Sequence, residues 1–428
     1  MSADVIEVQA PSRLFTVGIP VFNGRALLRA CLESVVGSSI AHERFEVLLA
    51  DDGSSEPETL AILEEFTQRY AAEPGFLRVI SLGVNSGGAA RPRNRILDEA
   101  RGEYVFFVDA DDTIGREALE RVAAVLSVRP ADWVALHQVM VNGRGAGATV
   151  SQDEVEVPRQ RALSTLTVHK VFRRAEIERQ GLRFDEGLPS GQDIAFAFSY
   201  IVNASRFLML GNYAYYYLTQ HSGNPDEPVH LSRTARTAEA LIAKNHRILA
   251  SMLGDLGRST LTDREKTRIL REVVLPRVLL RQRYLTSIAD SEPEAGERAL
   301  RDLAALLADP VVALVRPDSL TKGLRPEHLD AVRRVDLPAL REALAEVPPP
   351  PPPKAVVTRA ERWRGRGRRL VDVSRGLLGH RQVAAELATL RHALTELEAA
   401  QRRLEAEVQA LGGRTSDEPG PDRSTLRE

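Results

Sequence analysis

The sequence predicts an α/β fold with a mostly parallel central sheet, followed by a helical region and a C-terminal coiled coil. In residues 15–115, short apolar runs alternate with segments of helical spacing. Residues 232–347 have the pattern of amphipathic helices. From Val383 to Leu411, apolar residues recur at alternating spacings of four and three, which is a heptad pattern.

Each predicted strand of the first part ends in a polar loop. The apolar runs are FTVGIPV, FEVLLA, LRVISLG and YVFFV, and the loops after them are FNG, DDGSS, NSGGAARPRN and DADDT. Helical segments separate the strands, so the strands should be parallel. The carboxyl ends of parallel strands meet at one edge of the sheet, where such folds bind ligands. The four loops therefore predict a single binding site.

The pattern becomes mixed between Asp132 and Leu218. DWVALHQVMV is expected to form one strand, GQDIAFAFSYIVNA a helix and RFLMLGNYAYYYL a further strand. We interpret Tyr215, Tyr216 and Tyr217 as core and rim of this last strand. The expected divisions of the chain are a disordered N-terminus (1–13), an α/β domain (14–225), a helical domain (226–347), a proline-rich linker (348–358), an Arg-rich segment with a coiled-coil oligomerisation helix (359–412) and a disordered tail (413–428).

Three carboxylates follow the fourth strand at Asp109, Asp111 and Asp112. Aspartates are common turn residues, but three so close together repel one another and favour a nearby cation. Mg²⁺ takes one or two carboxylate oxygens together with substrate phosphates. The cluster therefore predicts half of a metal–diphosphate site. DADDT also fits the DxDxT motif of haloacid-dehalogenase-type phosphohydrolases, although in that family the motif normally follows the first strand.

Composition excludes several classes of function. The net charge of −2 gives no electrostatic basis for binding nucleic acid. The single cysteine, Cys31, allows no intrachain disulfide, so any metal must be held mainly by oxygen. The first residues lack a secretory pattern, and we expect a cytoplasmic protein. The Arg-rich segment is interpreted as a solvated helix, a contact with an anionic membrane at its inner face, or a binding strip for an acidic polymer.

The motifs PVFNG, DDGSS, NSGGAARPRN, FFVDADD and GQD occur in this order between Phe15 and Ser222. In order and spacing they resemble the family 2 glycosyltransferases with a GT-A fold. The resemblance implies a UDP-sugar donor, Mn²⁺ or Mg²⁺, and inversion at the anomeric carbon. The expected acceptor is a cell-envelope glycan or polyol-phosphate polymer of the teichoic-acid type, and the coiled coil is expected to make a homodimer or homotrimer, or to dock on another protein.

The resemblance also assigns roles to individual residues. Those expected to contact the nucleotide are Pro20, Val21, Asn23, Asp51, Asp52, Asn85, Gly87, Gly88, Arg93, Asn94, Asp109 and Ala110. One of the two aspartates at 51 and 52 would accept a hydrogen bond from uracil. Asp111 and His221 would contact the metal, and His221 would otherwise be a packed or surface imidazole.

Asp193 would be the general base, and the alternative for it is a helix first-turn acid. Two features depart from the family pattern: Gln192 stands where Glu is usual, and RPRNRI lacks a glycine and adds Arg91 and Arg95. A non-catalytic nucleotide-sugar-binding scaffold, assembled by the coiled coil, is the alternative to an enzyme.

Overall fold

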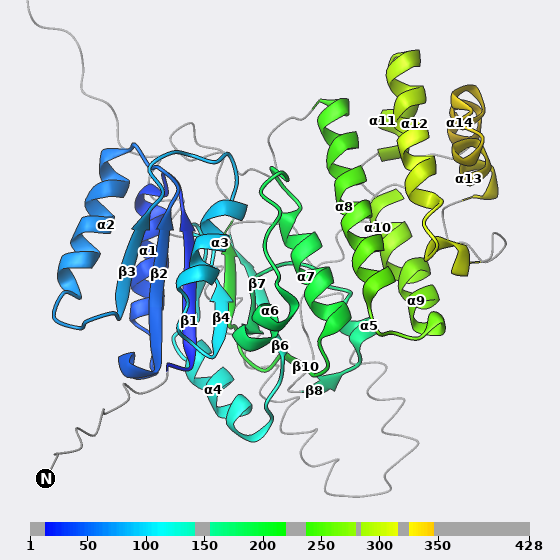
Figure 1. The fold of residues 1–428 in the computed structure, drawn as a ribbon. Helices are drawn as coiled ribbons and strands as arrows, with labels where there is room; N and C mark the ends of the chain where they lie inside the picture. Colours follow the sequence, from blue (N-terminus) through cyan, green and yellow to red (C-terminus); the bar gives the residue numbers. More distant parts are fainter. Residues whose placement is uncertain (1–12, 142–154, 220–236, 280–283, 316–324, 346–428) are drawn as a thin grey trace, which may run out of the picture. The chain divides into compact units, whose positions relative to one another are not determined.

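The computed structural model describes residues 13–141, 155–219, 237–279, 284–315 and 325–345 (Figure 1). All of these belong to the first of two compact units, Met1–Val347, and the second unit is Pro348–Glu428. His221, the proline-rich linker, the Arg-rich segment and the predicted coiled coil lie outside the described residues.

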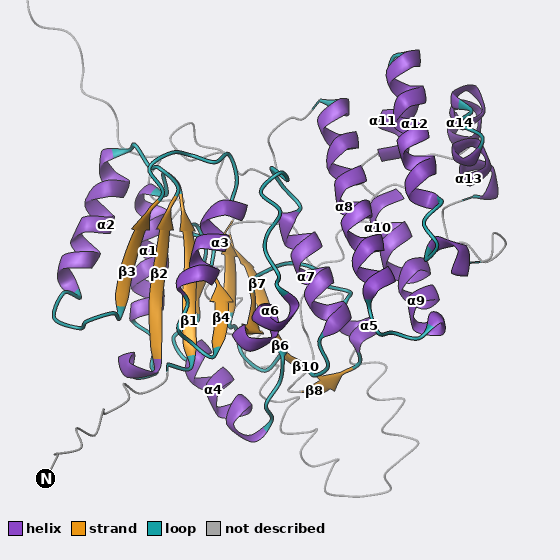
Figure 2. Ribbon diagram, viewed as in Figure 1, coloured by secondary structure: helices purple, strands orange, loops and turns teal. Residues whose placement is uncertain are grey.

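An eight-stranded sheet lies at the centre, with the order β3-β2-β1-β4-β9-β6-β10-β8 (Figure 2). Its strands are β1 (Phe15–Val21), β2 (Phe45–Asp51), β3 (Leu77–Ser81), β4 (Tyr104–Phe107), β6 (Trp133–Leu136), β8 (Val155–Val157), β9 (Lys170–Arg173) and β10 (Phe207–Leu210). The first four match the predicted strands closely. The β-branched and aromatic residues of β1, β2 and β4 are buried on both sides of the sheet, as a sheet covered by helices requires, whereas Val79 and Ile80 of the edge strand β3 are half-buried.

The sheet is mixed, and the prediction of a mostly parallel sheet was wrong in this respect. β3, β2, β1 and β4 are parallel to one another, but β9 runs antiparallel to both β4 and β6, and β8 runs antiparallel to β10. β9 is inserted between β4 and β6, which precede it in the chain. This long-range pairing leaves no trace in the local periodicity of the sequence.

Two predicted single strands are each divided between two sheets. The segment Trp133–Val141 forms β6 and then β7 (Gln138–Val141), while Phe207–Thr219 forms β10 and then β11 (Tyr216–Thr219). β7 and β11 pair in parallel and, with β5 (Thr113–Ile114), make a three-stranded sheet of order β5-β11-β7. The chain leaves the large sheet at His137, whose backbone N–H donates to Leu210 O at 2.8 Å. In the smaller sheet, β11 lies beside the residues that follow β4, where Asp109 N donates to Tyr216 Oη.

Helices cover both faces of the large sheet. One face packs against α1 (Arg25–Val36), α2 (Pro57–Arg69) and α4 (Ala118–Val128). The other packs against α3 (Ala90–Glu99), α6 (Arg174–Gln180) and α7 (Gln192–Asn203), with the short α5 (Arg159–Ala162) beside α7. Alternate residues of β2 divide between the two cores: Val47 and Leu49 face one, Leu48 and Ala50 the other.

The helices predicted after residue 232 are present where the structure describes them. They are α8 (Ala238–Arg258), α9 (Asp263–Ile269), a π-helical turn (Leu270–Val274), α10 (Leu275–Leu279), α11 (Tyr284–Ala289), α12 (Pro293–Leu307), α13 (Pro326–Arg333) and α14 (Leu337–Ala345). Pro276 follows the π turn, and a proline inside a helix disturbs the preceding turn because it lacks an N–H. Among the described helices, none is both long and apolar enough to cross a bilayer.

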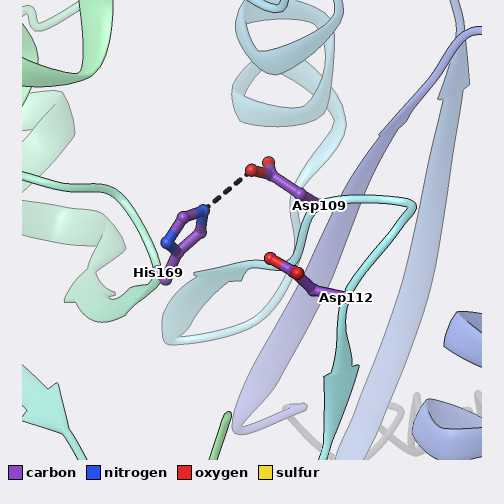
Figure 3. A group of neighbouring side chains, drawn as sticks. All are labelled: Asp109, Asp112 and His169. Carbon is purple, nitrogen blue, oxygen red and sulfur yellow. Dashed lines mark hydrogen bonds and ion pairs between the residues drawn. The ribbon is translucent and has the colours of Figure 1, made fainter. Parts of the chain in front are cut away.

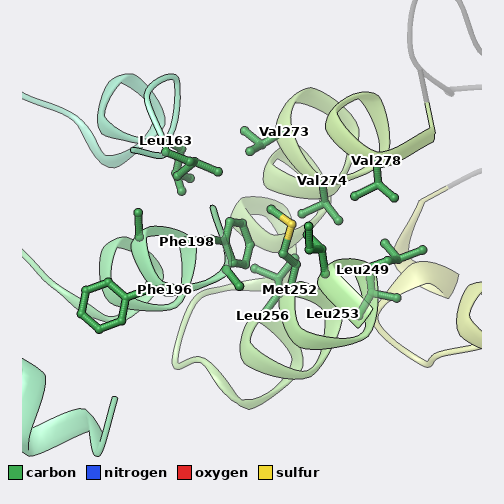
Figure 4. Close-up of a cluster of buried hydrophobic side chains, with 14 of the residues drawn as sticks. Leu163, Phe196, Phe198, Leu249, Met252, Leu253, Leu256, Val273, Val274 and Val278 are labelled. Atoms are coloured by element: carbon green, nitrogen blue, oxygen red, sulfur yellow. The ribbon is translucent and has the colours of Figure 1, made fainter. Parts of the chain in front are cut away.

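The helical region shares a hydrophobic core with the sheet domain. Phe196 and Phe198 of α7 belong to the same buried cluster as Leu249, Met252 and other residues of α8 and the following helices (Figure 4). Full burial of one such side chain contributes roughly 1.5–3 kcal/mol. The position of α8 is therefore fixed against α7 by apolar packing.

Candidate active site at the carboxyl edge of the sheet

Three polar loops meet where β1, β2 and β4 end. The parallel register sets Val21 beside Asp51 and Gly18 beside Phe107, so the residues that follow each strand emerge at the same edge. Val21 itself is buried in the core, and its carbonyl accepts a hydrogen bond from Asp52 N at 2.8 Å. Pro20 is half-buried beside it.

The loop after β1 is tied to the loop after β2 by Asn23. This residue adopts a left-handed conformation with φ of 49°, which asparagine tolerates better than most residues. Its Oδ1 accepts hydrogen bonds from Ser55 N at 3.0 Å and Glu56 N at 3.2 Å, and its own N–H donates to Ser54 Oγ. The Asn23 side chain thus organises the site, with its oxygen already used by the start of α2.

Asp52 follows β2 and is buried, and its two carboxylate oxygens differ in their hydrogen bonds. Its Oδ2 accepts hydrogen bonds from Ser86 N at 2.9 Å and Ser86 Oγ at 2.8 Å, whereas its Oδ1 is buried and has no partner among the described residues. An unsatisfied buried acceptor is costly unless a ligand or water supplies a donor. Asp51, in contrast, uses Oδ1 to accept from Ser54 N at 3.0 Å. Of the two aspartates, Asp52 is therefore the better candidate to accept a hydrogen bond from a ring N–H of a nucleobase.

The loop after β3 packs close to the loop after β2. A Cβ on Gly53, whose φ is +79°, would lie 2.8 Å from Asn85 N, so only glycine allows this approach. Asn85 Oδ1 accepts from Gly87 N at 2.6 Å and closes a tight turn. A Cβ on Gly88 would lie 3.4 Å from Pro189 O, which brings this turn next to the segment before α7.

Asp109, the first residue of the DADD cluster, lies between the side chains of Arg93 and His169. Its Oδ1 accepts from Arg93 Nη2 at 2.7 Å, and its Oδ2 contacts His169 Nε2 at 2.8 Å (Figure 3). Its backbone N–H donates to Tyr216 Oη at 3.1 Å. Burial alone raises the pKa of Asp109, but the charges of His169 and Arg93 outweigh it and hold the pKa well below the usual value. Asp109 therefore stays ionised.

Asp112 is almost fully buried and faces the same space. Tyr216 Oη donates to its Oδ2 at 2.8 Å, and Thr219 N donates to its Oδ1 at 2.8 Å. Burial raises the pKa of Asp112 to about 7, and the charges of Asp111 and Asp109 act in the same direction. Tyr216 thus bridges the two aspartates in addition to packing in the strand core.

The chemistry of this cluster suits a divalent cation. Ligand atoms of Asp109, Asp112 and His169 all lie within 4.8 Å of one another. Carboxylate oxygens suit Mg²⁺ and Mn²⁺, and an imidazole favours a first-row transition metal. Asp111 is partly exposed on the same turn, and Ala110 lies near Gly24 of the loop after β1.

The side chain of Asn94 forms hydrogen bonds with the segment that precedes α7. Its Nδ2 donates to Phe184 O at 3.0 Å and Glu186 Oε1 at 2.9 Å, and its Oδ1 accepts from Phe184 N at 2.8 Å. The neighbouring Arg93 stacks over the Phe184 ring at 5.6 Å. Asn94 therefore fixes the segment that leads to α7.

Asp193 lies in the first turn of α7, after Gln192, which is buried. Within the described residues its carboxylate makes no side-chain hydrogen bond of its own. The helix follows Gly191, whose φ of +83° requires glycine. Burial lowers the pKa of the neighbouring Lys170 to about 7, while the charge of Asp193 acts in the opposite direction.

Sequence reasoning missed His169 and the role of Tyr216. His169 stacks on the Tyr216 ring with a centroid distance of 4.8 Å and immediately precedes β9. Only the insertion of β9 beside β4 brings it to Asp109. A lone histidine before an apolar run carries no sequence signal of its own.

Comparison with known proteins adds the family context. The sequence profile of Glycosyl transferase family 2 matches residues 16–180. The chain is 34% identical over 212 residues to the poly(ribitol-phosphate) beta-N-acetylglucosaminyltransferase TarS of Staphylococcus aureus (strain Mu50 / ATCC 700699), covering 49% of this chain and 36% of TarS. It is 30% identical over 211 residues to the poly(ribitol-phosphate) beta-glucosyltransferase of Bacillus spizizenii, covering 49% of this chain and 32% of that protein.

A solved structure extends the similarity into the helical region. TarS 1–349 of S. aureus in complex with UDP-GlcNAc aligns with a TM-score of 0.66 and 27% identity, covering 78% of this chain and 92% of that one. The chain covers 55% of the longer TarS structure. The sequence match thus spans about a third of the curated relatives, whereas the structural match spans nearly all of TarS 1–349.

Proposed function

We propose that the chain is an inverting, metal-dependent glycosyltransferase, a proposal supported by the match of the Glycosyl transferase family 2 profile to residues 16–180. Its donor is a UDP-sugar, and its acceptor is a hydroxyl group of a polyol-phosphate polymer. The observation that carries the proposal is the meeting, at one sheet edge, of the Asp109 cluster and Asp52, whose buried Oδ1 has no partner among the residues that the structure describes.

The donor would lie across this edge, with its base at Asp52 and its diphosphate toward the DADD turn. Uracil carries a ring N–H that matches the unpartnered Oδ1 of Asp52. Arg93 is a buried guanidinium within this region, and it suits a diphosphate because its planar group of N–H donors matches phosphate oxygens. The alignment with TarS 1–349 bound to UDP-GlcNAc supports the same donor class.

A divalent cation would be held by Asp111, as the family resemblance implies, and by the group of Asp109, Asp112 and His169, whose ligand atoms all lie within 4.8 Å of one another. When bound, such an ion neutralises charge that develops on the leaving diphosphate. Asp109 also contacts Arg93 at 2.7 Å and His169 at 2.8 Å. His221 remains a proposed ligand.

Asp193 would accept the proton of the attacking hydroxyl. A hydroxyl group is a weak nucleophile, and a positioned base typically contributes about 10²–10⁴-fold to the rate. A carboxylate with no hydrogen bond of its own within the described residues is available for this proton. The relatives are named for β-linked products, and transfer from an α-linked nucleotide sugar to a β product requires inversion.

The phosphohydrolase alternative is not favoured. The DADDT segment follows the fourth strand of the chain, and both oxygens of Asp109 are engaged by Arg93 and His169. A nucleophilic aspartate would need one of these oxygens free to attack phosphorus.

The test is an assay with a panel of nucleotide sugars, Mn²⁺ and poly(ribitol phosphate), read by nucleoside diphosphate release and mass analysis of the polymer. We expect UDP release with UDP-GlcNAc or UDP-glucose, and a polymer heavier by one or more sugars. EDTA should stop the reaction, and added Mn²⁺ or Mg²⁺ should restore it. Inorganic phosphate release, or no product from any donor, would contradict the proposal, and full activity in EDTA would remove the metal from it.

A further inference from the structure

One segment connects the donor side of the site with the helical region. Residues Phe184 to Gly191 run from α6 to the start of α7, which carries Asp193. On the donor side, Asn94 makes three hydrogen bonds to Phe184 and Glu186, and Gly88 lies against Pro189. This segment is thus anchored to the helix that also holds Arg93.

The same segment is held from the other side by α8. Arg247 forms a two-pronged ion pair with Asp185, in which Nη2 lies 2.7 Å from Oδ1 and Nε contacts Oδ2. Two parallel hydrogen bonds from a planar guanidinium fix direction as well as distance. This hydrogen bonding also lowers the pKa of Asp185, so the pair stays charged.

Two glycines of the segment leave room for α8. A Cβ on Gly187 would lie 2.5 Å from Arg247 Nη2, so the guanidinium rests directly on this backbone. A Cβ on Gly191 would lie 2.7 Å from Ile248 Cδ1. About two turns further along, Ser199 of α7 donates a hydrogen bond to Asp255 of α8. Thus α8 contacts both this segment and α7, the helix that follows it.

We propose that α8 takes part in catalysis by positioning. Through Arg247 it holds the Asp185–Gly191 segment, and hence the general base Asp193, in place relative to the loop after β3. The inference rests on the proposed function. Arg247 is a positioning residue, since it touches Asp185 and Gly187 and acts on the reaction through them. A misplacement of about 1 Å in such a group costs on the order of 10²-fold in rate.

The first test compares the steady-state kinetics of Arg247→Ala with those of the wild type. We expect kcat to fall by about 10- to 100-fold, while the KM for the UDP-sugar and the Kd for UDP stay within about twofold. Arg247→Lys keeps the charge but loses the two-pronged geometry, and it should recover only part of kcat. The matched control is Arg268→Ala, which removes an exposed arginine of α9 that is paired with Glu272 at 3.2 Å; its kcat should be unchanged.

A second variant keeps both charges. Gly187→Ala places a methyl group where the guanidinium lies, so Arg247 must move although the ion pair remains possible. It should lower kcat in the same way as Arg247→Ala. The double variant Arg247→Ala/Asp185→Ala should be no worse than Asp185→Ala, which already removes the contact with Arg247 together with the hydrogen bond from Gly187 N at 3.0 Å.

Hydrogen exchange gives a readout that does not depend on turnover. Ile194 N and Ala195 N donate to Gly191 O at 3.0 and 3.3 Å, so their exchange reports the order of the start of α7. It should rise in Arg247→Ala and not in Arg268→Ala. Unchanged kcat, or unchanged exchange at these amides, in both Arg247→Ala and Gly187→Ala overturns the inference. A wild type that transfers no sugar would instead refute the proposed function. In that case, hydrogen exchange would still report whether Arg247 orders the start of α7.

Discussion

At the scale of single residues, the site depends on which oxygen of each carboxylate is already used. Asp51 and Asp52 are adjacent in a motif where sequence cannot tell them apart. The structure distinguishes them, because Asp51 Oδ1 serves its own turn through Ser54 N, whereas Asp52 Oδ1 is buried without a partner among the described residues. Asn23 and Asn94 hold loops in place, because their side-chain groups form hydrogen bonds with neighbouring segments.

Asp52→Asn should change the preferred base of the donor. Ser86 N donates to Oδ2, so the amide oxygen should keep that place and the amide nitrogen should replace Oδ1. A donor there opposes the N–H of uracil and suits the ring acceptor of cytosine. We expect UDP to bind about 10- to 100-fold more weakly and CDP more tightly. Calorimetry with both nucleotides measures this, with Asp98→Asn, exposed on α3, as the control. An equal loss for both nucleotides would contradict the assignment.

Asp193→Asn should abolish transfer while leaving donor binding intact. The amide cannot accept the proton of the hydroxyl, and the expected loss in kcat is about 10²–10⁴-fold. UDP release in the presence of acceptor measures kcat, and calorimetry measures the Kd for UDP. Turnover at the wild-type rate would remove Asp193 from the mechanism.

At the scale of elements, the site is made by strands that change partners. β6 and β10 of the large sheet continue as β7 and β11 of the small one, and this brings Tyr216 to Asp109 and Asp112. The antiparallel β9 brings His169 to the same place. The start of α7 then depends on a glycine in the left-handed region, with α8 packed against it.

Gly191→Ala should destabilise the fold for two separable reasons. Its φ of +83° costs an L-residue about 1–3 kcal/mol, and the new Cβ meets Ile248 Cδ1 at 2.7 Å. Ile248→Val removes that methyl group, so the double variant should lose less free energy of unfolding than the sum of the singles. Gly83→Ala, with φ of +75° and open space around it, is the control for the backbone contribution alone. Urea unfolding measures all four, and simple additivity would argue against the contact.

At the scale of the whole molecule, the helical region and the sheet domain share one buried core, so the first unit, Met1–Val347, is expected to act as a whole. The structural match to TarS 1–349 covers 78% of this chain and reaches past the sheet domain in the same way. We propose that residues 348–428 add assembly and polymer contact through the heptad segment and the Arg-rich segment.

A truncation after Val347 tests whether residues 348–428 are needed for assembly and polymer binding but not for sugar transfer. We expect the shortened chain to transfer sugar to a short ribitol-phosphate acceptor at the full-length rate. On long polymer it should lose affinity, because linked sites gain about 10²–10⁴-fold in avidity. Light scattering should show an oligomer for the full chain and a monomer for the truncated one. A monomeric full-length chain would refute the coiled coil as an oligomerisation device.

The sequence by itself determined the α/β class, the first four strands, the helical region and the edge where the loops gather. Local periodicity and turn residues report these features, since each depends on residues close in the chain. Only the tertiary structure decided that the sheet is mixed, that two apolar runs are each shared between two sheets, that His169 contacts Asp109, that Tyr216 contacts Asp109 and Asp112, and that Arg247 pairs with Asp185. These features depend on which distant segments pair, and pairing energy is spread over many weak contacts that no short stretch of sequence contains.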